Sequence, residues 1–77
     1  MVRAASVNVL QAEKFRAGAE LLGKIRSVGE PDSCRVTRAD EDCLEVCFDA
    51  PVFAPASGQH LVLYDGAEAI VAGGVIV

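Results

Sequence analysis

Apolar and polar residues alternate along several short segments of this 77-residue chain. The clearest segment runs from Cys43 to Phe48, where Leu44, Val46 and Phe48 occupy every second position. Alternation of this kind is typical of a strand with one buried face. From apolar or β-prone residues bounded by turn-forming residues, we predict five further strands: Ala5–Leu10, Ala19–Val28, Cys34–Arg38, His60–Tyr64 and Ala67–Val77.

Turn-forming residues separate these segments. Ala19–Val28 suits either a helix or a strand, and Gly23 in its middle favours the strand. Gln11–Gly18 is predicted as a helical turn or a loop. Gly29–Ser33 and Ala39–Asp42 are predicted as turns, and Val52–Ser57 as a proline-containing connection. About six short strands without an amphipathic helix predict an all-β fold. A small closed antiparallel β-barrel is the expected form, because closure leaves no strand edge unpaired.

The C-terminal segment carries the strongest local signal. Asp65-Gly66 separates two apolar runs, which predicts a tight hairpin turn with positive φ. Gly73-Gly74 then interrupts the second run. No phosphate-binding pattern of the GxxxxGK[ST] type is present and no helix follows, so we expect these glycines to permit a bulge or a close strand crossing.

The distribution of charge limits the choice of partner. All seven Lys and Arg lie within residues 1–38, which have a net charge of +3, whereas residues 39–77 have a net charge of −7. Because phosphates are neutralised by Lys and Arg, any contact with nucleic acid should fall to the first half. The length predicts a single domain spanning 1–77. No targeting or membrane-spanning segment is recognisable, so a soluble, cytoplasmic protein is expected.

Cysteine and histidine could in principle supply chemistry. Cys34, Cys43, Cys47 and His60 have the composition of a zinc site. On one strand, however, positions 43 and 47 would lie about 13 Å apart, too far for one tetrahedral ion. Acidic neighbours disfavour a reactive thiolate, and His60 is a lone histidine beside a turn. We therefore expect free thiols, no metal and no catalytic residue in this chain.

Several motifs together resemble the C-terminal segment of the bacterial tRNA-specific 2-thiouridylases. The matching residues, in chain order, are Val7-Asn8-Val9-Leu10, Lys24-Ile25-Arg26, Phe48 with Pro51, Ala54 with Ser57-Gly58-Gln59, Leu63-Tyr64-Asp65-Gly66 and Gly73-Gly74-Val75-Ile76. The resemblance covers almost the whole chain. It implies a six-stranded barrel similar to those of translation factors, with Gly58, Gln59, Tyr64, Asp65, Gly66, Gly73 and Gly74 as a structural motif.

The resemblance also implies part of a larger enzyme. Members of this family activate uridine 34 of certain tRNAs with ATP and then install sulfur, and their C-terminal domain helps to hold the tRNA. No ATP-binding loop of the SGGxDS type is present here. ATP and Mg are therefore expected in a missing catalytic domain, and the N-terminal ATP-binding and central domains of the same enzyme are expected partners.

Four basic residues are the candidates for the tRNA-facing edge: Lys24, Arg26, Arg35 and Arg38. In this hypothesis the acidic half faces solvent or the rest of the enzyme, and the isolated domain binds tRNA weakly. Two other functions stay open. One is a free-standing barrel that acts as a protein-interaction module, and the other is a small enzyme using His60 and a thiol.

Overall fold

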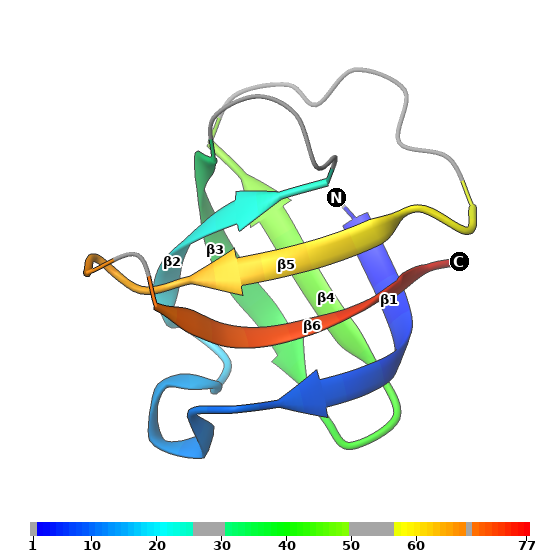
Figure 1. Cartoon of the computed structure of the whole chain (residues 1–77), viewed down its shortest axis with the longest axis horizontal. Helices are drawn as coiled ribbons and strands as arrows, with labels where there is room; N and C mark the ends of the chain where they lie inside the picture. The colour runs from blue at the N-terminus through cyan, green and yellow to red at the C-terminus, as the bar shows by residue number, and fades with distance from the viewer. Residues whose placement is uncertain (1, 26–30, 50–56, 68) are drawn as a thin grey trace.

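The fold of the protein was obtained as a computed structural model, which describes residues 2–25, 31–49, 57–67 and 69–77 (Figure 1). Within these residues the chain forms one short 3-10 helix and six strands: β1 (Val2–Val9), η1 (Ala12–Lys14), β2 (Glu20–Lys24), β3 (Asp32–Ala39), β4 (Leu44–Phe48), β5 (His60–Tyr64) and β6 (Ile70–Ile76). Arg26 and the predicted connection at 52–56 lie outside the described residues.

The six strands close into a barrel in the order β1-β4-β3-β2-β5-β6. Each neighbouring pair is antiparallel, and β1 completes the ring by pairing with β4 on one side and β6 on the other. Every strand therefore has two partners, and the predicted all-β, closed antiparallel barrel is confirmed. In this ring β4 and β5 stand on opposite sides, three strands apart in either direction.

Alternate residues of the strands fill the barrel interior. Leu44 and Val46 of β4 are fully buried, as their alternation predicts, and the intervening Glu45 points outward. The buried apolar residues form one cluster: Val2, Ala4, Cys34, Val36, Leu44, Val46, Leu61, Leu63, Val71, Ala72 and Ile76. All six strands except β2 contribute to it, while Gly23 of β2 lies directly beneath the Phe48 ring.

Gly74 allows β1 and β6 to approach closely. The pairing of β1 with β6 shifts between Ala5 and Asn8, where Ser6 adopts a φ of 54°. A Cβ atom at Gly74 would lie 2.9 Å from the carbonyl oxygen of Ala5, and one at Gly73 would lie 3.1 Å from that of Leu61. The expectation that this glycine pair accommodates a bulge and a close strand crossing is confirmed.

Several predicted boundaries were wrong. Strand β3 begins at Asp32, inside the predicted turn, because Asp32 and Ser33 pair with Gly23 and Leu22 of β2. Strand β1 likewise begins at Val2 and not at Ala5, because its first residues pair with β4. Such pairing between distant segments extends a strand beyond what the local residues alone favour.

The turn between β5 and β6 also differs from its prediction. The hairpin is present, but among the described residues neither Asp65 nor Gly66 has a positive φ. The connection is longer than a two-residue turn, and the N–H of Asp65 donates to the carbonyl oxygen of Ala69 at 2.9 Å. The Asp65 carboxylate accepts from the backbone N–H groups of Ala67 and Ala69. This side chain thus stabilises the loop through hydrogen bonds to its backbone.

Candidate functional site

Among the six strands, nearly all charged side chains belong to three neighbouring strands on one side of the barrel. Strands β2, β3 and β4 carry Glu20, Lys24, Asp32, Arg35, Arg38 and Glu45, whereas β5 and β6 carry no Asp, Glu, Lys or Arg. Strand β1 carries only Arg3, beside β4. We call β2, β3 and β4 the charged half, and β5, β6 and the part of β1 after Arg3 the uncharged half.

A bulge in β3 places two arginines on the same outer surface. Residues three apart on a regular strand face opposite sides of the sheet. The pairing of β3 with β4 shifts between Val36 and Arg38, so Thr37 is an extra, unpaired residue. Because of it, Arg38 lies on the same outer face of the sheet as Arg35. The hydroxyl of Thr37 donates to the carbonyl oxygen of Glu45 at 3.1 Å, which holds the bulge against β4.

A third arginine joins this surface from β1. Glu45 of β4 is paired in register with Arg38 on one side and with Arg3 on the other. One carboxylate therefore stands between two guanidinium groups. Sequence reasoning did not single out Arg3, and no local signal marks it, because its position depends on the pairing of β1 with β4.

The arginines are held by exposed carboxylates. Arg35 contacts Glu20 at 3.3 Å, and its side chain is 62% exposed. Arg38 contacts Asp40 at 2.6 Å and is 57% exposed. The hydrogen bond to Asp40 raises the pKa of Arg38. Exposed ion pairs contribute about 0–1 kcal/mol to stability, so an incoming anion can replace these carboxylates with little loss of free energy.

The other predicted basic residues lie elsewhere. Lys24 is the last residue of β2 and pairs with Val62 of β5. The residue before it, Gly23, pairs with Asp32 at the start of β3. Arg38 is six residues further along β3, about 20 Å away at the rise of a strand. Lys24 and Arg38 thus mark opposite ends of the charged half. Arg26 lies outside the described residues.

The division of charge along the sequence is not a division in space. Among the described residues there are four ion pairs, and three of them join a cation of residues 1–38 to a carboxylate of residues 39–77: Arg3–Glu45, Lys14–Asp65 and Arg38–Asp40. Barrel closure brings together the partners of Arg3–Glu45 and Lys14–Asp65, which are distant in the sequence, whereas Arg38 and Asp40 are only two residues apart. The contrast that results is between charged and uncharged strands, and not between basic and acidic ones.

Asp65 connects the loop after β5 to the 3-10 turn after β1. Its carboxylate accepts from Lys14 Nζ at 2.7 Å and from Gln11 Nε2 at 3.3 Å, in addition to the two backbone N–H groups described above. The hydrogen bond from the Lys14 ammonium, with a smaller contribution from the N–H of Ala69, holds the pKa of Asp65 well below its usual range. The predicted motif residue thus has a structural role, and Lys14 and Gln11 are partners that sequence reasoning missed.

The rest of the structural motif attaches strand ends to one another. Gly58 has a φ of 92° and its N–H donates to the carbonyl oxygen of Ile76. The N–H of Ile76 donates in turn to the carbonyl oxygen of Gln59 at 2.7 Å. Tyr64 pairs with Leu22 of β2 and with Ile70 of β6. Together with Gly73 and Gly74, these motif residues secure the closure of the barrel.

The thiols and the histidine are not brought together. Cys34 faces the interior, where burial, with a smaller contribution from Asp49, raises its pKa to about 11. Cys43 and Cys47 belong to β4 and the turn before it, whereas His60 lies on β5 across the barrel. No group of three or more His, Cys, Asp or Glu within the described ranges could hold a metal ion. This geometry gives no support to an enzyme that uses His60 and a thiol.

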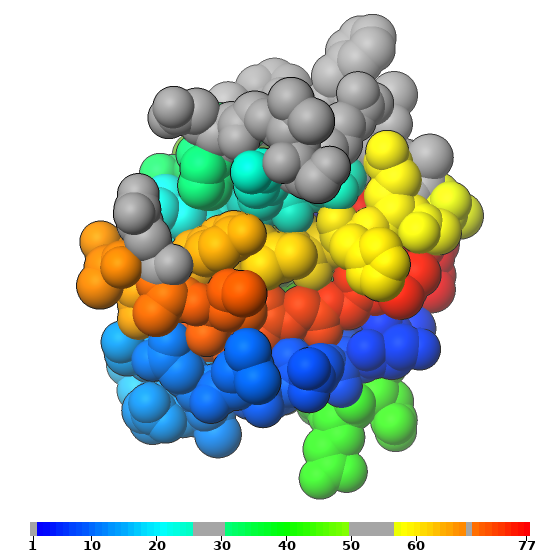
Figure 2. Space-filling view, in the orientation of Figure 1, coloured from blue at the N-terminus to red at the C-terminus, as the bar shows by residue number. Residues whose placement is uncertain are grey.

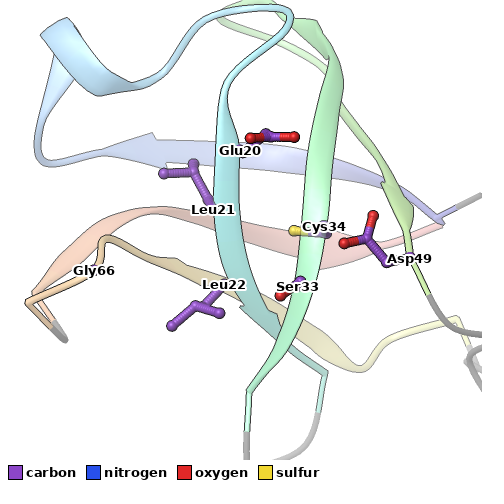
Figure 3. A pocket seen from close by; sticks show the side chains of 7 residues that line it. All are labelled: Glu20, Leu21, Leu22, Ser33, Cys34, Asp49 and Gly66. Carbon is purple, nitrogen blue, oxygen red and sulfur yellow. The ribbon is translucent and has the colours of Figure 1, made fainter.

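A hollow beside Cys34 offers no catalytic arrangement. Figure 3 shows it over β2 and β3, with the carboxylates of Glu20 and Asp49 among its lining side chains. Its other lining residues are Leu21, Leu22, Ser33, Cys34 and Gly66. Its described lining includes two carboxylates and no Lys or Arg, which disfavours phosphate even though Glu20 also contacts Arg35. The Cys34 thiol is protonated at neutral pH. Among the described residues, no helix has the length and apolar character needed to cross a membrane.

Comparison with known proteins places this barrel among domains of larger proteins. Residues 1–76 match the family described as aminomethyltransferase beta-barrel domain. The chain is 36% identical over 75 residues to the tRNA-specific 2-thiouridylase MnmA of Cupriavidus metallidurans, a match covering 97% of this chain and 21% of that protein. For MnmA of Clostridioides difficile the identity is 32% over 73 residues, covering 95% and 20%. For that of Shewanella halifaxensis it is 42% over 59 residues, covering 77% and 16%.

Proposed function

The chain belongs to the family of aminomethyltransferase β-barrel domains, and from this membership we propose that it is the non-catalytic C-terminal domain of a tRNA 2-thiouridylase. The matches span only 16–21% of the length of the relatives described above. In this proposal the remaining domains bind ATP and Mg and transfer sulfur to the target uridine in the cytoplasm. The barrel helps to hold the tRNA.

The outer surface of β3 is the observation that carries the tRNA-holding role. The bulge at Thr37 turns Arg35 and Arg38 to the same side, and Arg3 stands near them across Glu45. A guanidinium presents paired N–H donors that match the oxygens of a phosphate. The exposed carboxylates of Glu20 and Asp40, which now contact Arg35 and Arg38, are replaceable. Three guanidinium groups on one surface suit contact with an RNA backbone.

Binding of labelled tRNA to the 77-residue chain tests this role. We expect weak binding at physiological salt, because few phosphate contacts are available. The variant R35Q/R38Q should weaken the affinity about tenfold and reduce the slope of log K against log salt by about 1–2, as expected when two phosphate contacts are lost. Fluorescence anisotropy at several salt concentrations measures both quantities.

The control variant N8D/H60E makes the same change of net charge on the uncharged half. Asn8 and His60 are both exposed, on β1 and β5. If the arginines contact phosphate directly, this control should keep nearly the full affinity and the full salt slope. Equal losses in the two variants would mean that only net charge matters, and the arginine surface would not be the tRNA contact.

A free-standing protein-interaction module remains the alternative function, and one observation favours it. The uncharged half exposes apolar side chains, which is a property of protein-binding surfaces. The reading frame upstream of Met1 distinguishes the two functions. The proposed enzyme requires an ATP-binding domain there, whereas a frame that begins at Met1 would favour the module.

A further inference from the structure

We propose that the uncharged half of the barrel is the surface on which the domain docks against the preceding domains of the same polypeptide. This inference rests on the proposed function and adds to it the surface that makes the contact. Figure 2 looks onto this half, where β5, β6 and β1 lie side by side.

Within the described part of the chain, the large apolar side chains that stay exposed gather on this half. Among the described residues the large apolar side chains that remain exposed are Val9, Leu10, Ile70 and Val77. All four belong to β1, β6 or the residue that follows each. Leu10 is 61% exposed and Ile70 44%. A small domain rarely leaves its apolar exposure on one side unless that side is covered in the functional state.

A shallow groove runs across the same strands. Its walls are mostly apolar and include Leu10, Val62, Ile70 and Val75, while Asn8 and His60 add polar groups. Gly73 and Gly74 also line it and contribute no side chain. A Cβ atom at Gly74 would lie 2.9 Å from the carbonyl oxygen of Ala5, which excludes a side chain there, and one at Gly73 would crowd the carbonyl oxygen of Leu61 at 3.1 Å. An apolar floor with a few polar groups is the usual composition of a protein–protein contact.

Charge distinguishes a protein occupant from RNA. Among the described residues that line the groove there is no Asp, Glu, Lys or Arg. Without cations it cannot neutralise phosphates, so RNA gains little there. Charged side chains are depleted at the centres of protein interfaces, because their desolvation is unfavourable. The groove therefore fits an apolar protein surface.

The preceding domains are the occupant that the chain length supports. The matches cover 20–21% of two relatives and fall in their C-terminal region, so most of each relative precedes the segment like this one. In such a polypeptide the connection enters at the start of β1, close to the chain end, where the N–H of Val77 donates to the carbonyl oxygen of Arg3 at 3.1 Å. A short tether gives the tethered domain a millimolar effective concentration, which suffices for a modest contact area.

Methyl NMR on the 77-residue chain tests this proposal. The labelled chain is titrated with the preceding part of its own gene product, and its spectrum is compared with that of the intact enzyme. We expect shifts at Leu10, Val62, Ile70 and Val75. The variant L10K/I70K should weaken docking about tenfold or more, because it places two charges in the apolar contact. The control S33K/C47K adds the same charges to exposed positions of β3 and β4 and should leave docking intact.

Several results would overturn the proposal. They are shifts restricted to β3, equal losses in the two variants, or no shift on this half in either the mixture or the intact enzyme. A dimer that L10K/I70K abolishes would assign the surface to a second copy, and tRNA-induced shifts there would assign it to RNA. A reading frame starting at Met1 would remove the partner. If the domain docks as proposed but R35Q/R38Q leaves the tRNA affinity unchanged, the tRNA-holding role is rejected and the docking surface is kept.

Discussion

The two halves of this barrel share one core but present different surfaces. The charged half, together with Arg3 of the neighbouring β1, carries three guanidinium–carboxylate contacts, around Arg3, Arg35 and Arg38. The uncharged half carries exposed leucine, isoleucine and valine and a groove whose described lining residues include no Asp, Glu, Lys or Arg. Because the strands alternate inward and outward residues, the interior can stay uniform while each outer side is suited to a different partner. A small closed barrel can thus contact RNA on one side and protein on the other.

The largest effect on stability is expected where the uncharged half is most tightly closed. In Gly74→Ala the new methyl group would lie 2.9 Å from the carbonyl oxygen of Ala5 and 3.0 Å from the Cβ of Ala4. Crowding of this kind destabilises by about 1–3 kcal/mol. Urea unfolding measures the loss. Gly66→Ala is the matched control, because a methyl group there would meet no described atom within 4 Å beyond its chain neighbours, and its φ is not positive. A free energy of unfolding unchanged in Gly74→Ala would contradict the close crossing.

A smaller effect is expected from Asp65, which connects the loops at the boundary of the two halves. Because its pKa is lowered in the folded protein, its stabilising contribution is fully present above the unfolded pKa of about 4 and is lost as the pH falls below that value. Asp65→Asn removes this contribution. The variant should be less stable than the wild type at neutral pH, and its stability should change less between about pH 6 and pH 3. Identical pH profiles in urea unfolding would exclude the ion pair with Lys14 as a source of stability.

The smallest effect on stability is expected on the charged half. The double variant E20Q/D40N removes the carboxylates that contact Arg35 and Arg38. Exposed ion pairs contribute little, so the free energy of unfolding should change by less than about 1 kcal/mol. The affinity for tRNA should rise, because two arginines lose competing anions and two negative charges are gone. A fall in affinity would indicate that these carboxylates position the arginines and do not compete for them.

Much of the fold follows from local patterns in the sequence. The alternation at Leu44–Phe48 and the bounds of His60–Tyr64 are found in the structure as predicted. The glycine pair at 73–74 was correctly interpreted as a close crossing. The start of β3 and the form of the Asp65 loop were not predicted, because both depend on partners distant in sequence, namely β2 and the turn containing Lys14.

The candidate surfaces were harder to predict. Arg38 shares a face with Arg35 only because of the bulge at Thr37, and Arg3 reaches the same surface only through the pairing of β1 with β4. The charge count along the chain predicted a basic part and an acidic part. The register of the barrel mixes them and produces a charged and an uncharged half instead. Register is a property of the closed sheet and is not contained in any single segment.

The most direct test of the two-sided barrel is a map of tRNA contacts on the isotope-labelled 77-residue chain. Addition of tRNA should shift the amide resonances of β3 and β4 around Arg35, Arg38 and Glu45, and should leave those of β6 unchanged. Shifts confined to residues 58–77 would contradict the assignment of the charged half to tRNA.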